Sequence, residues 1–281
     1  MAGCGFDAAP TSILELKDGD SSHVIYGDDS IKDVVGVAPN SEASVALVRK
    51  SVYQEYKKNK NIYNVSEVYG IDDLPWSDQP SLAFCSGVRI GEDLVLTAGH
   101  CVENNLDCSN IDVIFNYEAQ GEITASVGCK EIVKLRNDIN ETGLDYALIR
   151  LERTLAGSSV KLNRSGWKSI KNKESVYSLG YPLGSFKKKA LGKIRKVLDK
   201  PEIYVSNLDV FEGNSGSPIF SAMTHELIGI LSSGETDFIQ SSEGTSVQVK
   251  RCNNTGCSGE FIIPIEKISD DLYKNVANQN K

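Results

Sequence analysis

Short apolar runs separated by turn-forming residues are the feature that most restricts how this chain can fold. Many of the runs alternate between apolar and polar residues, and Gly, Asp and Asn stand between them. They are Ser81–Ile90, Asp93–Thr97, Asp112–Tyr117, Ile123–Val127, Tyr146–Leu151, Ser175–Leu179, Ile203–Val205, Ser217–Phe220 and Leu227–Leu231. Runs of this length with turn residues between them are typical of strands in barrels and sandwiches. The sequence therefore predicts an all-β fold.

Helical patterning is confined to two regions. Ser41–Tyr56 is compatible with a helix, a strand or both. Ile265–Val276 follows a proline and carries apolar residues three or four positions apart, which predicts a C-terminal helix. The polar stretch Thr154–Glu174 has few strand signals, so we expect the boundary between two halves of the chain there.

The charge balance argues against several classes of partner. Among 281 residues, 38 are acidic and 30 are basic, giving a net charge of −8. Nucleic-acid and anionic membrane surfaces both favour basic proteins, so neither is expected as a partner. The longest uncharged run, Gly213–His225, is too short for a membrane helix, which needs about 18 residues or more. The basic run Lys187–Lys196 is interpreted as a solvent-exposed strand and hairpin face, with a processing or docking site as the alternative.

The cysteine pattern predicts disulfides rather than a metal site. There are 7 cysteines and 3 histidines, and no two cysteines have C-x-x-C spacing. A structural zinc site is therefore not expected. Six cysteines lie in one body of sequence, which fits disulfides formed in an oxidising compartment outside the cytoplasm, whereas Cys4 stands alone.

Three segments carry residue types suited to nucleophilic catalysis. Leu96–Cys101 contains His100, Gly143–Leu151 contains Asp145, and Gly213–Pro218 contains Ser215. Each segment taken alone fits an ordinary strand end or turn. Together they supply a hydroxyl nucleophile, a base to take its proton, and a carboxylate to orient that base.

These segments resemble the trypsin/chymotrypsin family of serine endopeptidases, which uses the order His, Asp, Ser. The choice of Asn214 and Ser217 around the serine is more similar to the bacterial branch, which includes the glutamyl endopeptidases. The resemblance covers about residues 24–275. It implies two antiparallel six-stranded β-barrels with a C-terminal α-helix, and peptide hydrolysis through an acyl-enzyme without metal or organic cofactor.

The resemblance also implies a role for each matching residue. Ser215 would attack the scissile carbonyl, His100 would be the base and then the acid, and Asp145 would orient His100. The N–H groups of Gly213 and Ser215 would form the oxyanion hole. Ser232, Ser233 and Gly234 would form one wall of the substrate cleft and pair with the substrate backbone, with an ordinary edge strand as the alternative.

Substrate preference is less well determined. The family position six residues before the nucleophile holds Asp209, and an Asp there selects Lys or Arg in trypsin-like members; the alternative is that Asp209 caps a turn. The neighbouring Glu212 is a second candidate substrate contact. Glutamyl endopeptidases carry a His on the pocket wall where this chain has Leu231, which argues against glutamyl specificity.

The resemblance implies a disulfide between Cys85 and Cys101, beside His100. The local pairings Cys108–Cys129 and Cys252–Cys257 are favoured for the rest, with other pairings open. Cys4 lies in a segment similar to the end of a bacterial lipoprotein signal, so a lipid anchor and a stray thiol are both open. A secreted, periplasmic or lipoprotein-anchored location and a monomeric state are expected.

The expected organisation is a leader or propeptide arm over residues 1–23, an N-terminal barrel over 24–160, and a C-terminal barrel with its helix over 161–281. Val24–Gly27 resembles a mature N-terminus, which predicts cleavage near His23. Animal relatives pair the new amine with an Asp where this chain has Asn214, so that switch is not expected. A zymogen, a catalytically silent binding module of the same fold, and an esterase remain alternatives.

Overall fold

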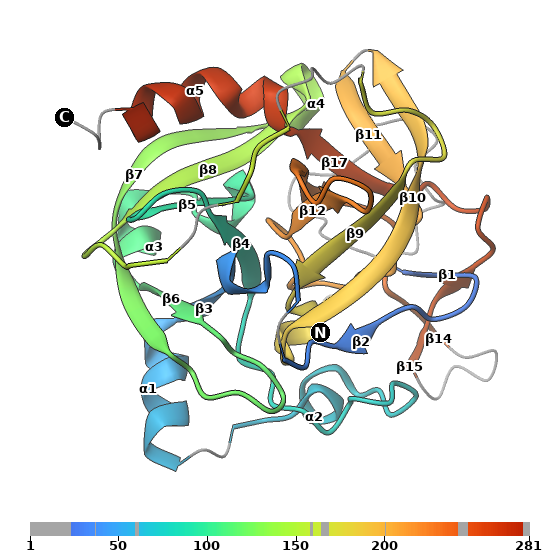
Figure 1. The fold of residues 1–281 in the computed structure, drawn as a ribbon. Helices are drawn as coiled ribbons and strands as arrows, with labels where there is room; N and C mark the ends of the chain where they lie inside the picture. Colours follow the sequence, from blue (N-terminus) through green and yellow to red (C-terminus); the bar gives the residue numbers. More distant parts are fainter. Residues whose placement is uncertain are drawn as a thin grey trace.

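The first barrel has six antiparallel strands in the order β3-β4-β5-β8-β7-β6 (Figure 1). A computed structural model describes residues 24–36, 38–59, 62–157, 160–163, 169–199, 201–240 and 247–277. The strands of this barrel are β3 Ser44–Arg49, β4 Cys85–Arg89, β5 Leu94–Thr97, β6 Ile111–Phe115, β7 Ala125–Asp138 and β8 Leu144–Leu151. Apolar side chains from all six strands meet in one buried cluster, because alternate strand residues face inward.

The second barrel is also antiparallel and closes through the pairing of β10 with β11. Its strands are β9 Ser175–Gly180, β10 Lys188–Asp199, β11 Glu202–Ser206, β12 Pro218–Ser221, β13 Leu227–Ser233 and β17 Glu260–Pro264. Val176, Ile194, Ile219 and Ile228 contribute to its buried core. The expectation of two six-stranded barrels is confirmed.

The N-terminal segment pairs with the second barrel although it precedes the first in sequence. Strand β1 (Ile25–Tyr26) runs parallel to β16 (Arg251–Cys252), and β2 (Lys32–Asp33) runs antiparallel to β10. A separate hairpin is formed by β14 (Phe238–Gln240) and β15 (Val247–Val249). The N-terminal segment therefore lies along the second barrel, and the strands of the first barrel follow it in sequence.

Helices connect and cover the barrels. They are α1 Lys50–Asn59, α2 Val65–Tyr69, α3 Asn105–Ser109, α4 Ile139–Thr142 and α5 Ile265–Ala277, with 3-10 turns η2 Ser41–Ala43, η3 Gly99–Cys101 and η5 Pro182–Gly184. Ile265, Ile268 and Leu272 of α5 pack into a core shared by both barrels. The C-terminal helix is thus confirmed, and Ser41–Tyr56 contains both a strand and a helix. No helix among the described residues is long and apolar enough to cross a membrane.

The interpretation of Lys187–Lys196 as a solvent-exposed face is wrong at its first two residues. The run does form strand β10, but the side chains of Lys187 and Lys188 are 0% and 2% exposed. Each ammonium lies beside a carboxylate: Lys187 Nζ is 2.9 Å from Glu118 Oε1, and Lys188 Nζ is 2.6 Å from Asp33 Oδ1. These acidic partners come from distant parts of the chain. Their attraction to the two ammonium groups offsets the free-energy cost of removing those charges from water.

Candidate active site

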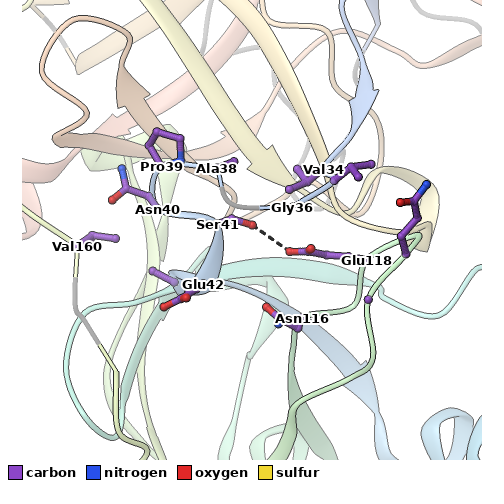
Figure 2. A pocket seen from close by; sticks show the side chains of 14 residues that line it. Val34, Gly36, Ala38, Pro39, Asn40, Ser41, Glu42, Asn116, Glu118 and Val160 are labelled. Carbon is purple, nitrogen blue, oxygen red and sulfur yellow. Dashed lines mark hydrogen bonds between the residues drawn. The ribbon is translucent and has the colours of Figure 1, made fainter.

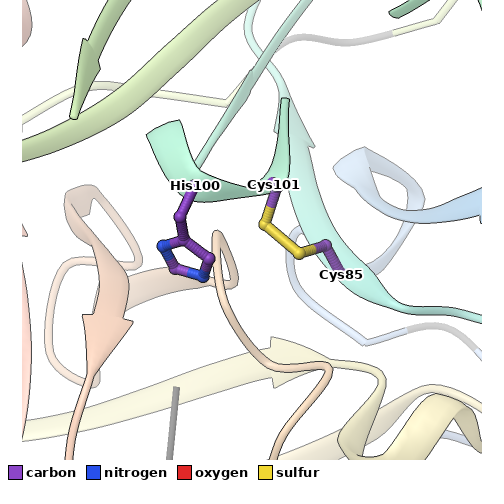
Figure 3. Close-up of side chains that lie close together, drawn as sticks. All are labelled: Cys85, His100 and Cys101. Carbon is purple, nitrogen blue, oxygen red and sulfur yellow. A yellow bond between two sulfur atoms is a disulfide. The ribbon is translucent and has the colours of Figure 1, made fainter. Parts of the chain in front are cut away.

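His100 is held at the end of β5 by a 3-10 turn and a disulfide. It is the middle residue of η3, and the Cys85–Cys101 disulfide ties that turn to β4 (Figure 3). A Cβ on Gly99 would overlap the Asp145 carboxylate and the backbone carbonyl of Arg136. The glycine before His100 therefore allows the turn to approach β8 closely.

Asp145 lies on β8 and receives hydrogen bonds from two neighbours. The His100 backbone N–H donates to Oδ1 at 2.9 Å, and Nδ1 of its ring lies 2.8 Å from Oδ2. The Ser232 hydroxyl donates to Oδ2 at 2.6 Å. Since Asp145 is only 2% exposed, these contacts replace the water that an ionised carboxylate would otherwise need. The arrangement fixes the imidazole with Nδ1 toward the carboxylate.

The two groups stabilise each other's charged forms. Burial raises the pKa of Asp145, but the hydrogen bonds from His100 and Ser232 and the charge of His100 outweigh burial, and the net pKa lies below its ordinary value. Burial lowers the pKa of His100, but the hydrogen bond and charge of Asp145, with the charge of Glu103, raise the net pKa above its ordinary value. An imidazolium formed during a reaction is therefore stabilised here.

Ser215 lies in the loop that leads into β12, facing the end of β13. Its hydroxyl donates to the carbonyl of Ser232 at 3.4 Å. Within the described part of the chain, Nε2 of His100 has no hydrogen-bond partner. Hydrogen bonds between catalytic groups often tighten only when substrate is bound, so this geometry is compatible with a resting site.

The loop around Ser215 leaves two backbone donors available. Asn214, Gly216 and Ser217 donate their N–H groups to the carbonyls of Phe211, Leu231 and Asn214, respectively. Among the described residues, Gly213 and Ser215 use theirs in no backbone hydrogen bond.

Gly213 has φ +88°, and a Cβ there would lie 2.6 Å from the Tyr181 carbonyl oxygen. Glycine is required because a side chain would meet both the strained backbone angle and this close contact. The loop conformation that leaves the N–H of Gly213 available therefore depends on this residue.

Ser86 supports the Ser215 loop and was missed by sequence analysis. Its N–H donates to the Ser215 carbonyl at 2.8 Å, and its hydroxyl donates to the Gly213 carbonyl at 2.7 Å. The same hydroxyl accepts from the N–H of Tyr181 at 3.0 Å. Its position directly after Cys85, the cysteine expected to pair beside His100, is the one signal that could have singled it out.

The candidate substrate-binding residues fall into two groups. Ser232 and Ser233 end β13 with Gly234 directly after them, beside Ser215. Glu212 is exposed and directly precedes Gly213. Asp209 is 2% exposed, and its carboxylate accepts hydrogen bonds from Tyr26 and Ser30 of the N-terminal segment. The structure thus brings Ser232 into contact with Ser215, whereas Asp209 has partners within the protein.

The cysteines are joined as expected. Disulfides link Cys85 with Cys101, Cys108 with Cys129, and Cys252 with Cys257. Cys85, His100 and Cys101 are the one group of described residues close enough to share a metal ion, but both thiols are in the disulfide and cannot act as thiolate ligands (Figure 3). Cys4 and His23 lie outside the described residues.

A cavity of about 690 Å³ lies elsewhere, between residues 34–36 and 38–43, the loop 116–121 and Val160 (Figure 2). None of the candidate catalytic residues lines it. Glu118 reaches across it to the hydroxyl of Ser41, at 2.9 Å. The cavity therefore belongs to the connection between the barrels and not to the site around His100.

Comparison with known proteins identifies the family. The family model described as a trypsin-like peptidase domain matches residues 85–230, which include His100, Asp145 and Ser215. The chain belongs to the trypsin-like peptidase family. The family assignment makes this trypsin-like peptidase a serine-type endopeptidase with a polypeptide substrate.

Solved structures support the fold of the trypsin-like peptidase. The VesB protease of Vibrio cholerae superposes with a TM-score of 0.53 at 16% identity, over 88% of this chain and 67% of that protein. A Glu endopeptidase, solved in complex with MPD, superposes with a TM-score of 0.52 at 19% identity, over 82% of this chain and 94% of that protein. No curated protein matches the sequence. At these identities the structural similarity concerns the fold.

Proposed function

We propose that this serine endopeptidase cleaves peptide bonds with Ser215 as nucleophile, His100 as general base and Asp145 as the group that orients His100. One observation carries the proposal: the buried Asp145 carboxylate accepts a hydrogen bond from the backbone N–H of His100 and lies 2.8 Å from Nδ1 of its ring. The chain belongs to a family whose chemistry needs this pair of a histidine and a carboxylate. The contact leaves Nε2 of His100 as the nitrogen that can take a proton from a hydroxyl.

The reaction then follows from the positions of the proton and the charge. Nε2 of His100 accepts the proton of Ser215 as Oγ attacks the scissile carbonyl carbon, and the resulting imidazolium is stabilised by Asp145. The oxyanion that forms is held by the N–H groups of Gly213 and Ser215. His100 then donates its proton to the leaving amine, and the acyl-enzyme is hydrolysed by water in a second passage through the same steps.

The proposed substrate is an extended peptide with a basic residue before the cut. Ser232, Ser233 and Gly234 would pair with its backbone, as an added strand at the end of β13. Glu235 and Asp237, which follow Gly234 in the chain, are buried acidic residues and support the basic preference, since a nearby carboxylate favours a cationic side chain. A library of peptides that vary the residue before the cut tests this preference.

An extracytoplasmic location is proposed from the disulfides. Three of them close within the described residues, and such bonds persist in oxidising compartments. We include secretion by a bacterium, a mature chain beginning near Val24 and a monomeric state in the proposal, with a lipid on Cys4 as one form of anchoring. Cell fractionation and mass analysis of the natural protein test these points together.

The decisive experiment for the catalytic proposal is intact-mass analysis after reaction with a fluorophosphonate, comparing wild type with Ser215→Ala. One adduct per chain is expected on the wild type and none on the variant, because the probe needs an activated serine and an oxyanion hole. Replacing such a nucleophile costs about a millionfold in turnover. A folded wild type that stays unlabelled would favour a zymogen or a silent binding module and contradict the proposal. Repeating the reaction after trimming to Val24 separates these two alternatives.

A further inference from the structure

The turn η5 holds a leucine in a strained backbone conformation. Leu183, its middle residue, has φ 52° and ψ 27°, in the left-handed region that a bulky side chain rarely adopts. The residue is 0% exposed and shares a buried apolar cluster with Trp76 and Phe211. Such a conformation persists only where the surrounding structure holds it, and strain of this kind gathers at functional sites. The contacts of the turn therefore show what the strain serves.

On one side, the turn is held by the segment just before β4. The hydroxyl of Ser81 donates to the Leu183 carbonyl at 2.8 Å. The N–H groups of Leu82 and Ala83 both donate to the Gly184 carbonyl, at 2.8 Å and 3.2 Å. Three consecutive residues thus hold the two carbonyls at the end of η5 in place.

On the other side, the turn contacts the peptide group between Glu212 and Gly213. The Leu183 N–H donates to the Glu212 carbonyl at 2.5 Å. In a trans peptide the C=O and the N–H point in opposite directions, so the Gly213 N–H points away from η5. A flip of this peptide would turn the N–H toward the turn and put a carbonyl oxygen in its place. The Leu183 N–H therefore sets the direction of a proposed oxyanion donor.

The neighbouring backbone groups have other partners. The Glu212 N–H donates to Asp237 Oδ2 at 2.9 Å, and the Gly213 carbonyl accepts from the Ser86 hydroxyl at 2.7 Å. Both groups belong to the peptides before and after the one that carries the Gly213 N–H. Within the described part of the chain, the Leu183 N–H is the only donor to the Glu212 carbonyl. The orientation of the central peptide therefore depends on the turn.

We propose that Leu183 and Ser81 are positioning residues for the oxyanion hole: Ser81 helps to hold Leu183 in its left-handed conformation, and the Leu183 N–H keeps the Glu212–Gly213 peptide from flipping. The inference rests on the proposed function, because it explains what keeps one of the proposed oxyanion donors available. Neither residue touches the substrate or the reacting atoms in this role.

The test uses a fluorophosphonate and its thio analogue, in which sulfur replaces the phosphoryl oxygen. In both reactions Ser215 Oγ bonds to phosphorus and fluoride leaves, so both need the same nucleophile and base. Backbone N–H groups hold the oxygen better than the sulfur, since sulfur is a weak acceptor. The labelling ratio, defined as the rate with oxygen over the rate with sulfur, therefore reports on the oxyanion donors. A general loss of structure lowers both rates together.

Leu183→Ala and Leu183→Gly separate the strained turn from simple packing. Both remove the buried leucine side chain, but only alanine keeps the steric cost of φ 52°. In Leu183→Ala the turn is expected to relax, so the labelling ratio and kcat for a peptide should each fall about tenfold with little change in KM. In Leu183→Gly the turn keeps its conformation without strain, so the ratio should stay within about twofold of wild type. Its Tm should also exceed that of Leu183→Ala.

Ser81→Ala tests the other contact without changing Leu183. It removes the hydroxyl that donates to the Leu183 carbonyl, and it should lower the labelling ratio about threefold, because the turn is then held less firmly. Ser44→Ala is the matched control. It removes a buried hydroxyl that donates to a carbonyl of β9, that of Leu179, at 2.9 Å, and it should lower Tm without changing the ratio.

The outcomes distinguish this inference from the proposed function. A wild type that neither probe labels contradicts the catalytic proposal itself. If the wild type is labelled but the ratio falls as far in Leu183→Gly as in Leu183→Ala, packing and not the conformation of the turn holds the loop, and the inference is overturned. If Leu183→Ala does not fold, Ser81→Ala decides: a ratio equal to that of Ser44→Ala overturns the inference, and a lower one supports it.

Discussion

At the scale of single residues, the contact between His100 and Asp145 determines how the enzyme should respond to pH. The pKa of His100 is raised above its ordinary value of 6.5, and only the neutral imidazole can accept a proton from Ser215. We therefore expect kcat/KM to fall as the pH drops through an apparent pKa above 6.5. Initial rates measured between pH 5 and 9 check this, and a flat profile from pH 5 to 8 would contradict the role of His100.

Glu103 offers a matched variant for the same measurement. It is an exposed carboxylate whose charge contributes to the raised pKa of His100 without touching the ring. Glu103→Gln removes that charge, so the midpoint of the pH profile should move to lower pH while the plateau rate is kept. The shift should shrink at high salt, because exposed charges are screened. A shift to higher pH would mean that a different group controls the profile.

At the scale of elements, β4 supports the Ser215 loop through Ser86. Removing the hydroxyl leaves the Tyr181 N–H without its acceptor and the Gly213 carbonyl without one donor, both in a buried place. Ser86→Ala should therefore lower the unfolding free energy by about 1–3 kcal/mol and slow fluorophosphonate labelling. Urea unfolding and labelling kinetics measure the two effects. Ser109→Ala, which removes an exposed hydroxyl bonded to the Leu106 carbonyl, should change neither, and an equal effect there would refute the role of Ser86.

Elements with local signals could be predicted from the sequence, whereas contacts between distant elements could not. Apolar alternation identified strands such as β5 and β8, and the residues around His100 and Ser215 carried a family pattern. The pairing of β1 with β16 joins segments at opposite ends of the chain, and no local pattern encodes it. The burial of Lys187 was missed for the same reason: a lysine at the start of a basic run resembles a solvent-exposed one until its neighbours are known.

At the scale of the whole molecule, the barrels are joined by polar contacts as well as by a shared apolar core. Lys187, just before β10 of the second barrel, donates to the carbonyl of Ser41 at 2.8 Å. It also lies 2.9 Å from Glu118, in the loop between β6 and β7 of the first barrel. Glu118 in turn accepts from the Ser41 hydroxyl across the cavity in Figure 2. One ammonium thus connects the second barrel, the turn η2 that precedes β3, and the first barrel.

This connection predicts a strong energetic coupling between Lys187 and Glu118. Lys187 is fully buried, so burial lowers its pKa, and the charge and hydrogen bond of Glu118 oppose that effect. Lys187→Met should lower the unfolding free energy by about 3–5 kcal/mol, because it leaves the largely buried Glu118 carboxylate without its cation. The double variant Lys187→Met/Glu118→Gln should recover part of this loss, since no charge is then left unpaired. Urea unfolding of both single variants and the double variant measures the coupling, and strictly additive losses would show that the two barrels do not depend on this ion pair.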